Sequence, residues 1–114
     1  MTIFICGDST AASYTEDKAP ITGWGQVLGE LLPGVNIANH AMAGRSSKSF
    51  LAEGRLQPVE ASLQPGDLLL IQFTHNDRNP KPERFTDPEH TFPAYLNVYI
   101  ETARAHGATP VLMT

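Results

Sequence analysis

A serine follows the first apolar segment of the chain, in the run Gly7-Asp8-Ser9-Thr10. A serine nucleophile needs an exposed hydroxyl on a rigid support with backbone N–H groups nearby, and a turn that leaves a buried strand supplies both. The same position also suits a residue that only caps a following helix. Taken alone, the short motif favours the cap, so the nucleophile hypothesis depends on what surrounds Ser9.

Two other segments carry groups that suit the stabilisation of negative charge. Gly44 lies in a turn, where a glycine lets a backbone N–H approach an oxyanion closely, although turn glycines are common for other reasons. Asn76 carries an amide that can donate to a developing oxyanion, and Asp77 is predicted to accept local backbone N–H groups and hold the loop. An Asn-Asp pair is also typical of an ordinary turn.

Short apolar segments alternate with helical patterns along the chain. Strands are predicted at residues 3–6, 35–38, 68–73 and 111–113. Three helices are predicted. The first is capped by Thr22, and its apolar face carries Trp24, Val27, Leu28, Leu31 and Leu32. A weaker helical pattern has Leu56, Val59 and Leu63 on one face, and the third helix covers residues 92–103 and ends at Gly107. This alternation predicts an α/β fold, with a parallel sheet and right-handed crossover connections in one domain.

The polar segments follow three of the predicted strands. Ser9 comes after the first strand, Gly44 after the second and Asn76 after the third. In open parallel sheets the carboxyl ends of the strands meet at one edge, and ligands bind there. Their shared edge favours an active site over three unrelated turns.

The composition bounds the kind of protein. The chain has 114 residues and a net charge of −4, with its Lys and Arg scattered, so neither nucleic acid nor an anionic membrane surface is an expected partner. Its one cysteine, Cys6, lies in an apolar segment and is predicted to fill the core. We find no membrane-spanning segment and no signal peptide, so a cytoplasmic location is expected for the chain as written, and secretion if a leader was removed.

Four blocks stand in order along the chain: Gly7-Asp8-Ser9-Thr10, Gly23-Trp24-Gly25-Gln26, Gly44-Arg45-Ser46-Ser47-Lys48-Ser49-Phe50 and Ile71-Gln72-Phe73-Thr74-His75-Asn76-Asp77. These blocks resemble the SGNH (GDSL-like) hydrolase family, in its rhamnogalacturonan acetylesterase-like branch. The resemblance covers nearly the whole chain. It implies the three-layer, flavodoxin-like SGNH hydrolase fold.

The resemblance also implies roles for individual residues. Ser9 is the nucleophile, and the Ser9 and Gly44 backbone N–H groups form the oxyanion hole with the Asn76 amide. The implied reaction removes an acetyl group from a carbohydrate of the pectin type through an acyl-serine intermediate. The implied partner is a small-molecule or oligosaccharide ester, and neither a metal nor an organic cofactor is implied.

Two departures from the family pattern stand out. Thr74 occupies the glycine position of the third block, Gly-x-Asn-Asp, and a β-branched residue does not easily take a positive φ. If the site needs that conformation, a displaced oxyanion loop is expected. The second departure concerns the catalytic base, which the family supplies from a block Asp-x-x-His near its C-terminus and which this chain is predicted to lack.

Residues 1–114 are therefore predicted to form a single incomplete SGNH hydrolase domain, with the C-terminal portion missing. The last strand is then a sheet edge without a neighbour, and marginal stability or self-association through that edge is predicted. His40 and His75 lie near the predicted active edge, while His90 and His106 fall in a loop and at a helix end. None of the four is expected to act as the base, which must reach the serine and be oriented by a third group.

Three alternatives remain open from the sequence. A catalytically inactive SGNH fold would serve as a carbohydrate-binding or interaction module. The Gly7–Thr10 turn would cradle a phosphate or nucleotide at a helix N-terminus, although it has one glycine and no lysine. Asp8 would be the nucleophile of a phosphotransfer enzyme, with Mg²⁺ held by Asp8 and Asp77.

Overall fold

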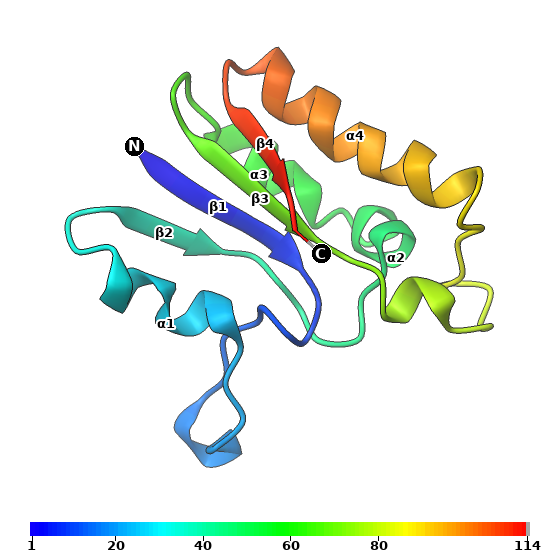
Figure 1. Ribbon diagram of the computed structural model, residues 1–114, viewed down its shortest axis with the longest axis horizontal. Helices are drawn as coiled ribbons and strands as arrows, with labels where there is room; N and C mark the ends of the chain where they lie inside the picture. The colour runs from blue at the N-terminus through cyan, green and yellow to red at the C-terminus, as the bar shows by residue number, and fades with distance from the viewer. Residues whose placement is uncertain (114) are drawn as a thin grey trace.

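The computed structural model describes residues 1–113, which form a four-stranded sheet and its connecting helices (Figure 1). The elements are β1 (Thr2–Gly7), α1 (Trp24–Leu31), β2 (Asn36–Asn39), α2 (Ser47–Ala52), α3 (Leu56–Ser62), β3 (Leu68–Gln72), α4 (Thr91–Ala105) and β4 (Thr109–Leu112), with short 3-10 helices at Glu16–Lys18 and Asn76–Arg78. All four predicted strands form, each within about two residues of its expected bounds.

The sheet has the strand order β2-β1-β3-β4, and every neighbouring pair is parallel (Figure 1). β1 lies in the middle, where Ile3 pairs with Leu68 and Gly7 with Gln72 of β3. The predicted α/β fold with a parallel sheet is confirmed. This order puts the carboxyl ends of β1, β2 and β3 next to one another.

Alternate residues of the strands enter two separate cores, because successive side chains of a strand point to opposite faces. On one face, Cys6 and Ile71 pack with α2, α3 and α4 around the buried Phe50 and Tyr99. On the other face, Ile5 packs with α1. Helices thus cover both faces, and the predicted three-layer arrangement is confirmed.

The start of α1 differs from the sequence prediction. Its N-cap is Gly23 in an extended conformation, not Thr22, whose hydroxyl donates to the Pro20 carbonyl at 3.4 Å. The apolar stripe also stops early. Leu28 packs on the core, but Leu31 is 74% exposed because the helix ends there and the chain turns back into β2.

One helix was not predicted from the sequence. α2 follows the turn at Gly44, and Ser46 caps it by accepting a hydrogen bond from the Ser49 N–H while the Ser49 hydroxyl accepts from the Ser46 N–H. The usual capping box has Glu or Gln at the fourth position. Here that position is Ser49, and the first turn of the helix is short and polar. The segment therefore has no clear helical pattern in the sequence.

β4 forms one edge of the sheet and leaves apolar side chains in contact with solvent. Val111 and Leu112 are both exposed, Leu112 by 51%. An exposed apolar edge strand is a template for pairing with another chain. Among residues 1–113, no helix combines the length and the apolar character that crossing a bilayer requires.

Candidate active site

The three predicted site residues lie on loops that hydrogen bonds tie together. The loop after β2 is tied to β1, since the Met42 N–H donates to the Gly7 carbonyl at 3.0 Å. It is tied to the loop after β3 as well, since the Asn76 side-chain amide donates to the Arg45 carbonyl at 3.1 Å. The segments of Ser9, Gly44 and Asn76 are therefore brought to one edge of the sheet, as their sequence positions indicated.

Three kinds of hydrogen bond fix the backbone of the turn that carries Ser9. The Asp8 carboxylate accepts from the Thr10 N–H at 3.0 Å and from the Thr10 hydroxyl at 2.9 Å. The Asp8 carbonyl accepts the N–H groups of Ala11 and Ala12. The Ser9 carbonyl accepts the Tyr14 hydroxyl at 2.8 Å. Three of the four backbone groups that flank Ser9 are bonded, and within residues 1–113 the Ser9 N–H has no acceptor.

A second layer of side chains supports this turn. The Gln26 side chain accepts from the Tyr14 N–H at 2.8 Å and donates to the Tyr14 carbonyl at 3.1 Å. The Gln72 side-chain oxygen, at the end of β3, accepts the Trp24 indole N–H at 2.6 Å and lies 2.9 Å from the Thr10 hydroxyl. The Gly23–Gln26 block thus acts as a support for the Ser9 turn, a role that its sequence did not indicate.

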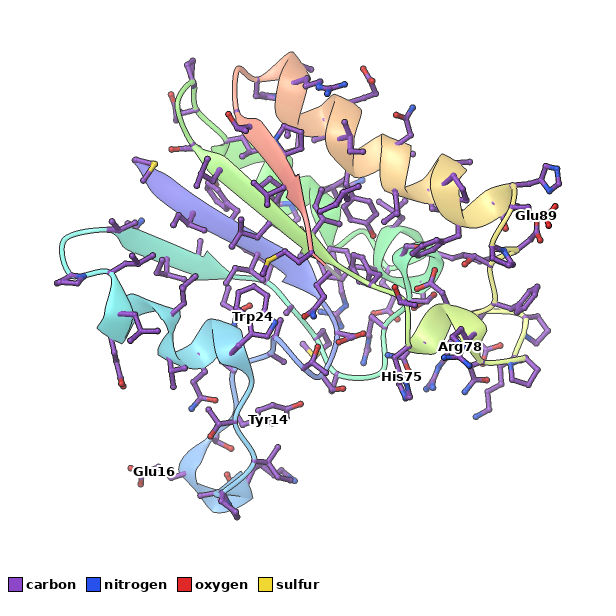
Figure 2. All side chains as sticks on the ribbon, viewed as in Figure 1. Tyr14, Glu16, Trp24, His75, Arg78 and Glu89 are labelled. Atoms are coloured by element: carbon purple, nitrogen blue, oxygen red, sulfur yellow. The ribbon has the colours of Figure 1, made fainter. Side chains whose placement is uncertain are left out.

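Trp24 was predicted from the helical stripe to pack in the core. It is half-buried against the α1-side core, and Figure 2 shows it beside the ends of the strands. Because its indole N–H is also bonded to Gln72, the side chain combines packing with an anchoring hydrogen bond.

Gly44 takes a φ of +80°, a left-handed conformation that favours glycine over every other residue. Its N–H has no acceptor within residues 1–113, so it is available to a ligand, like that of Ser9. Space for a side chain at this position is bordered by a single described atom at ordinary contact distance. A Cβ at this position would lie 3.6 Å from Nη2 of Arg84, a residue of the loop before α4.

Asn76 is buried and uses one amide hydrogen for the Arg45 carbonyl, which leaves the second hydrogen for another acceptor. Thr74 does not strain this loop, because every positive φ in the described residues belongs to a glycine. The substitution of the family glycine by Thr74 is therefore accommodated with an ordinary backbone conformation.

Asp77 holds the loop, but through partners different from those expected. It was predicted to accept local N–H groups, and it instead accepts the Ser47 N–H at 2.9 Å, the Ser47 hydroxyl, and the Thr86 hydroxyl at 2.8 Å. The Tyr99 hydroxyl in turn donates to the Ser47 carbonyl at 2.8 Å. Asp77 thereby joins the start of α2 to the loop after β3.

Two of the hollows that border these residues also contact His75. One of about 140 Å³ is lined by Asp8, Thr10, Gln72, Phe73, Thr74 and His75. The other, of about 350 Å³, is lined by His75, Asn76, Arg78 and Asn79. His75 borders both, and Figure 2 shows it next to Arg78 beyond the end of β3.

The sequence contains one Asp-x-x-His run that the sequence analysis passed over, Asp87 to His90. Its two side chains pair at 2.7 Å between the His90 Nδ1 and the Asp87 carboxylate, and this hydrogen bond lowers the pKa of Asp87. The pair is exposed and directly precedes α4. Figure 2 shows Glu89, within this run, at the outer border of the molecule, away from His75 and Trp24. The run has the family's pattern, and within residues 1–113 neither of its paired side chains is hydrogen-bonded to Ser9.

The other histidines are accounted for by their surroundings. Partial burial lowers the pKa of His40, whose ring stacks with Phe4 at a centroid distance of 6.2 Å. His106 caps the C-terminal end of α4, and its Nδ1 lies 2.9 Å from the Thr102 carbonyl. Within residues 1–113, no histidine side chain is hydrogen-bonded to Ser9.

The two carboxylates of the phosphotransfer alternative, Asp8 and Asp77, both already accept hydrogen bonds. Asp8 accepts from Thr10 of its own turn and Asp77 from Ser47 and Thr86, and residues 1–113 contain no group of three or more His, Cys, Asp or Glu that could hold a metal ion. The Ser9 turn lies at the same sheet edge as the loops of Gly44 and Asn76, whose N–H donors are not fully used within residues 1–113. This favours nucleophilic acyl transfer over the two phosphate-based alternatives.

Comparison with known proteins identifies relatives over almost the whole chain, although no protein family model matches it. The chain is 47% identical over 113 residues to the rhamnogalacturonan acetylesterase RhgT of Bacillus subtilis and 46% identical over 114 residues to the probable rhamnogalacturonan acetylesterase YesY of the same organism. A rhamnogalacturonan acetylesterase of Emericella nidulans is 43% identical over 76 residues, which are 67% of this chain and 28% of that protein. The matched region is 98% of this chain but 47% of RhgT and 52% of YesY, so the chain spans about half the length of these two relatives.

Solved structures agree with this relationship. The crystal structure of the YxiM protein of Bacillus subtilis superposes with a TM-score of 0.87 at 30% identity, over 97% of this chain and 31% of that one. The psychrotrophic esterase EstA from Pseudoalteromonas gives a TM-score of 0.66 at 21% identity, over 98% of this chain and 58% of EstA, which shows a shared fold.

Proposed function

This chain belongs to the SGNH hydrolase family, in the branch of the rhamnogalacturonan acetylesterases, and we propose that it forms the nucleophile-bearing part of a carbohydrate O-acetyl esterase. The observation that carries the proposal is the Ser9 turn. It is fixed by hydrogen bonds at three of its flanking backbone groups and leaves the Ser9 N–H free. The relatives named as rhamnogalacturonan acetylesterases support an acetylated pectic polysaccharide as the substrate.

In the proposed reaction, the Ser9 Oγ attacks the carbonyl carbon of the acetyl ester. The carbonyl oxygen becomes negatively charged and accepts hydrogen bonds from the Ser9 and Gly44 N–H groups and from the second amide hydrogen of Asn76. Donors of this kind lower the barrier because they are already oriented toward the developing charge. The bond between the acyl carbon and the sugar oxygen then breaks, and the sugar oxygen takes up the proton that the base removed from Ser9. Water next attacks the acetyl-serine ester through the same base, which releases acetate and returns a proton to the Ser9 Oγ.

The proton of the Ser9 hydroxyl needs a base within hydrogen-bonding reach. The family resemblance implies a histidine from an Asp-x-x-His block near the C-terminus of longer relatives. In this chain, His75 is the exposed histidine that borders the hollow next to Asp8, and Asp87 with His90 forms the one pair of the family's pattern. These two histidines are the groups to test.

The proposal is tested by hydrolysis of p-nitrophenyl acetate by the unaltered chain and by Ser9→Ala, with Ser62→Ala at the exposed end of α3 as the matched control. Turnover that is lost in Ser9→Ala and kept in Ser62→Ala would establish the nucleophile. His75→Gln and His90→Gln would then show whether either histidine supplies the base. Equal rates for all variants and the unaltered chain would refute an acyl-serine mechanism.

A binding function is the second candidate, because neither side chain of the Asp87–His90 pair is hydrogen-bonded to Ser9 within residues 1–113, and Figure 2 shows Glu89 of this run away from His75 and Trp24. In this case the chain binds an acetylated oligosaccharide without releasing acetate. Calorimetric binding together with unchanged acetate in solution would distinguish this function from catalysis.

Self-association through the exposed edge of β4 remains a prediction. Sedimentation velocity over a range of concentrations checks it, and a monomer at every concentration would contradict it.

A further inference from the structure

The side-chain amide of Gln72 lies beside the Ser9 turn and takes no part in the reaction proposed above. Gln72 ends β3 and pairs with Gly7 of β1. Leu68 and Leu70, which share its face of β3, are apolar and pack against the α1-side core. A polar side chain on such a face has to recover the cost of leaving water through hydrogen bonds. The partners of this amide therefore show what it is placed to do.

Trp24, which lies beside the ends of the strands, fixes which way the Gln72 amide points (Figure 2). An indole N–H only donates, and the Trp24 Nε1 lies 2.6 Å from the Gln72 Oε1. Turning the amide over would set two donors against each other, so the oxygen has to face Trp24. The same oxygen lies 2.9 Å from the Thr10 hydroxyl. The nitrogen Nε2, with its two hydrogens, is therefore the free end of the side chain.

The Nε2 of Gln72 is accessible to a ligand. Gln72 is half-buried, and within the described part of the chain every fully buried nitrogen or oxygen of such side chains has a hydrogen-bond partner. The Nε2 has no acceptor within residues 1–113, so it is not fully buried. Gln72 lines the hollow of about 140 Å³ together with Asp8 and Thr10, the two residues that flank Ser9. Its amide hydrogens are therefore open to a ligand in that hollow.

The hollow is large enough for part of a sugar ring. Its volume of about 140 Å³ is close to that of a cavity that holds a benzene ring, roughly 150 Å³. The Asp8 carboxylate at its border already accepts from the Thr10 N–H and the Thr10 hydroxyl. The Gln72 amide is neutral and can donate to a hydroxyl, a ring oxygen or a carbonyl. A neutral sugar ester is thus a ligand of matching chemistry.

The acetyl group itself leaves no acceptor for the Gln72 amide. In the proposed reaction the carbonyl oxygen accepts from the Ser9 N–H, the Gly44 N–H and the Asn76 amide, which together use the three lone pairs of an oxyanion. The bridging oxygen of the ester takes up the proton that the base delivers. The acceptors that remain on the substrate are the hydroxyl and ring oxygens of the sugar.

We infer that Gln72 is a specificity-determining residue, whose Nε2 donates to a hydroxyl or ring oxygen of the sugar that carries the acetyl ester. The inference rests on the proposed function, because the hollow adjoins the Ser9 turn. Acetates of plain alcohols lack these oxygens, so the hydrogen bond favours sugar acetates over them. The bond from Trp24 to the Gln72 Oε1 keeps the amide in the orientation that leaves the Nε2 free.

The test compares two ligands of ¹⁵N-labelled Ser9→Ala, in which the ester stays intact. The ligands are an O-acetylated methyl galactopyranoside and cyclohexyl acetate. Both carry an acetyl ester on a six-membered ring, but cyclohexyl acetate has no oxygen outside its ester. The sugar ester should shift the side-chain N–H signals of Gln72, which are assigned by their loss in Gln72→Glu. Cyclohexyl acetate should leave these signals in place.

Two variants of Gln72 separate the donor from the rest of the side chain. Gln72→Glu keeps an oxygen for Trp24, and Gln72→Met adds no charge. Both should weaken binding of the sugar ester by about three- to ten-fold, as expected for one lost hydrogen bond between neutral groups, and change the affinity for cyclohexyl acetate by less than about two-fold. Gln57→Glu makes the same change at an exposed position of α3 and should alter neither affinity.

Three results would overturn the inference: equal losses for the two ligands, a loss in Gln72→Met alone, or no binding of the sugar ester. The first two would show that Gln72 only supports the Ser9 turn. Gln72-dependent binding of the sugar ester without Ser9-dependent release of acetate by the unaltered chain would keep the inference and refute only catalysis. Ser9-dependent hydrolysis of p-nitrophenyl acetate with binding that does not depend on Gln72 would refute the inference and keep the proposed function.

Discussion

Two glycines of α1 should respond in opposite ways to the same substitution. A Cβ on Gly25 would lie 2.4 Å from the Ala11 carbonyl oxygen and 2.6 Å from the Asn39 side-chain nitrogen. A Cβ on Gly29, one turn later, would lie 3.5 Å from a side-chain carbon of Ile37, which is an ordinary van der Waals contact. Gly25 is buried and Gly29 is exposed.

The size of each effect follows from these distances. Alanine in a helix interior gains up to about 1 kcal/mol over glycine, so Gly29→Ala should stabilise the chain by about 0.5–1 kcal/mol. At Gly25, the Ala11 backbone has to move by about 0.6 Å before the contact reaches the 3.0 Å below which real Cβ contacts are essentially absent. Overpacking of this kind costs about 1–3 kcal/mol, so Gly25→Ala should destabilise by about 2 kcal/mol net.

Urea unfolding measures both free energies. Circular dichroism is the suitable signal, because Trp24 lies next to Gly25 and its fluorescence would respond to the substitution itself. With a slope of about 1–1.5 kcal/mol per molar urea, the two midpoints should differ by roughly 2 M. Because Ala11 also donates to the Asp8 carbonyl, any Ser9-dependent turnover should fall in Gly25→Ala and persist in Gly29→Ala. Equal stability of the two variants would refute the argument that α1 packs on the Ser9 turn through glycine.

Asp77→Ala should lower the free energy of unfolding by about 3 kcal/mol, because the buried donors of Ser47 and Thr86 lose their acceptor. Denaturant unfolding measures this loss, and a change below about 1 kcal/mol would contradict the prediction. Burial raises the pKa of the Cys6 thiol, so a thiol reagent at pH 8 should modify it only after urea unfolding, and rapid labelling of the folded chain would speak against this. Burial lowers the pKa of His40 below 6.5, so the folded state binds fewer protons than the unfolded state, and stability should fall as the pH drops below 6.5. Urea unfolding at pH 7.5 and 5.5 checks this, and the pH effect should shrink in His40→Gln.

The strands and the shared edge were predictable from sequence because their signals are local. Apolar runs such as Leu68 to Phe73 mark buried strands, and parallel order follows from the alternation with helices. Once the sheet is parallel, the residues just after its strands have to meet. The neighbourhood of Ser9, Gly44 and Asn76 therefore followed from topology without any knowledge of their side-chain contacts.

The supporting contacts were not predictable, because they join residues far apart in sequence and leave no periodic pattern. Gln72 looks like one more residue of a buried strand, yet its side-chain oxygen bonds Trp24 across 48 residues. Asp77 was assigned local partners and has distant ones, because Ser47 at the start of α2 presents its N–H there. The Asp87–His90 run was overlooked because the family places its counterpart near the C-terminus.

The Gln72 contact also bears on the order in which the chain becomes functional. Gln72 lies 62 residues after Thr10, and the strand pairing of Gly7 with Gln72 spans a similar separation. Contacts between such distant residues form late, because the loop between them has to close first. On the ribosome, the serine leaves the exit tunnel long before the strand that anchors its turn. A nascent chain thus carries the Ser9 turn without its Gln72 anchor until β3 has emerged.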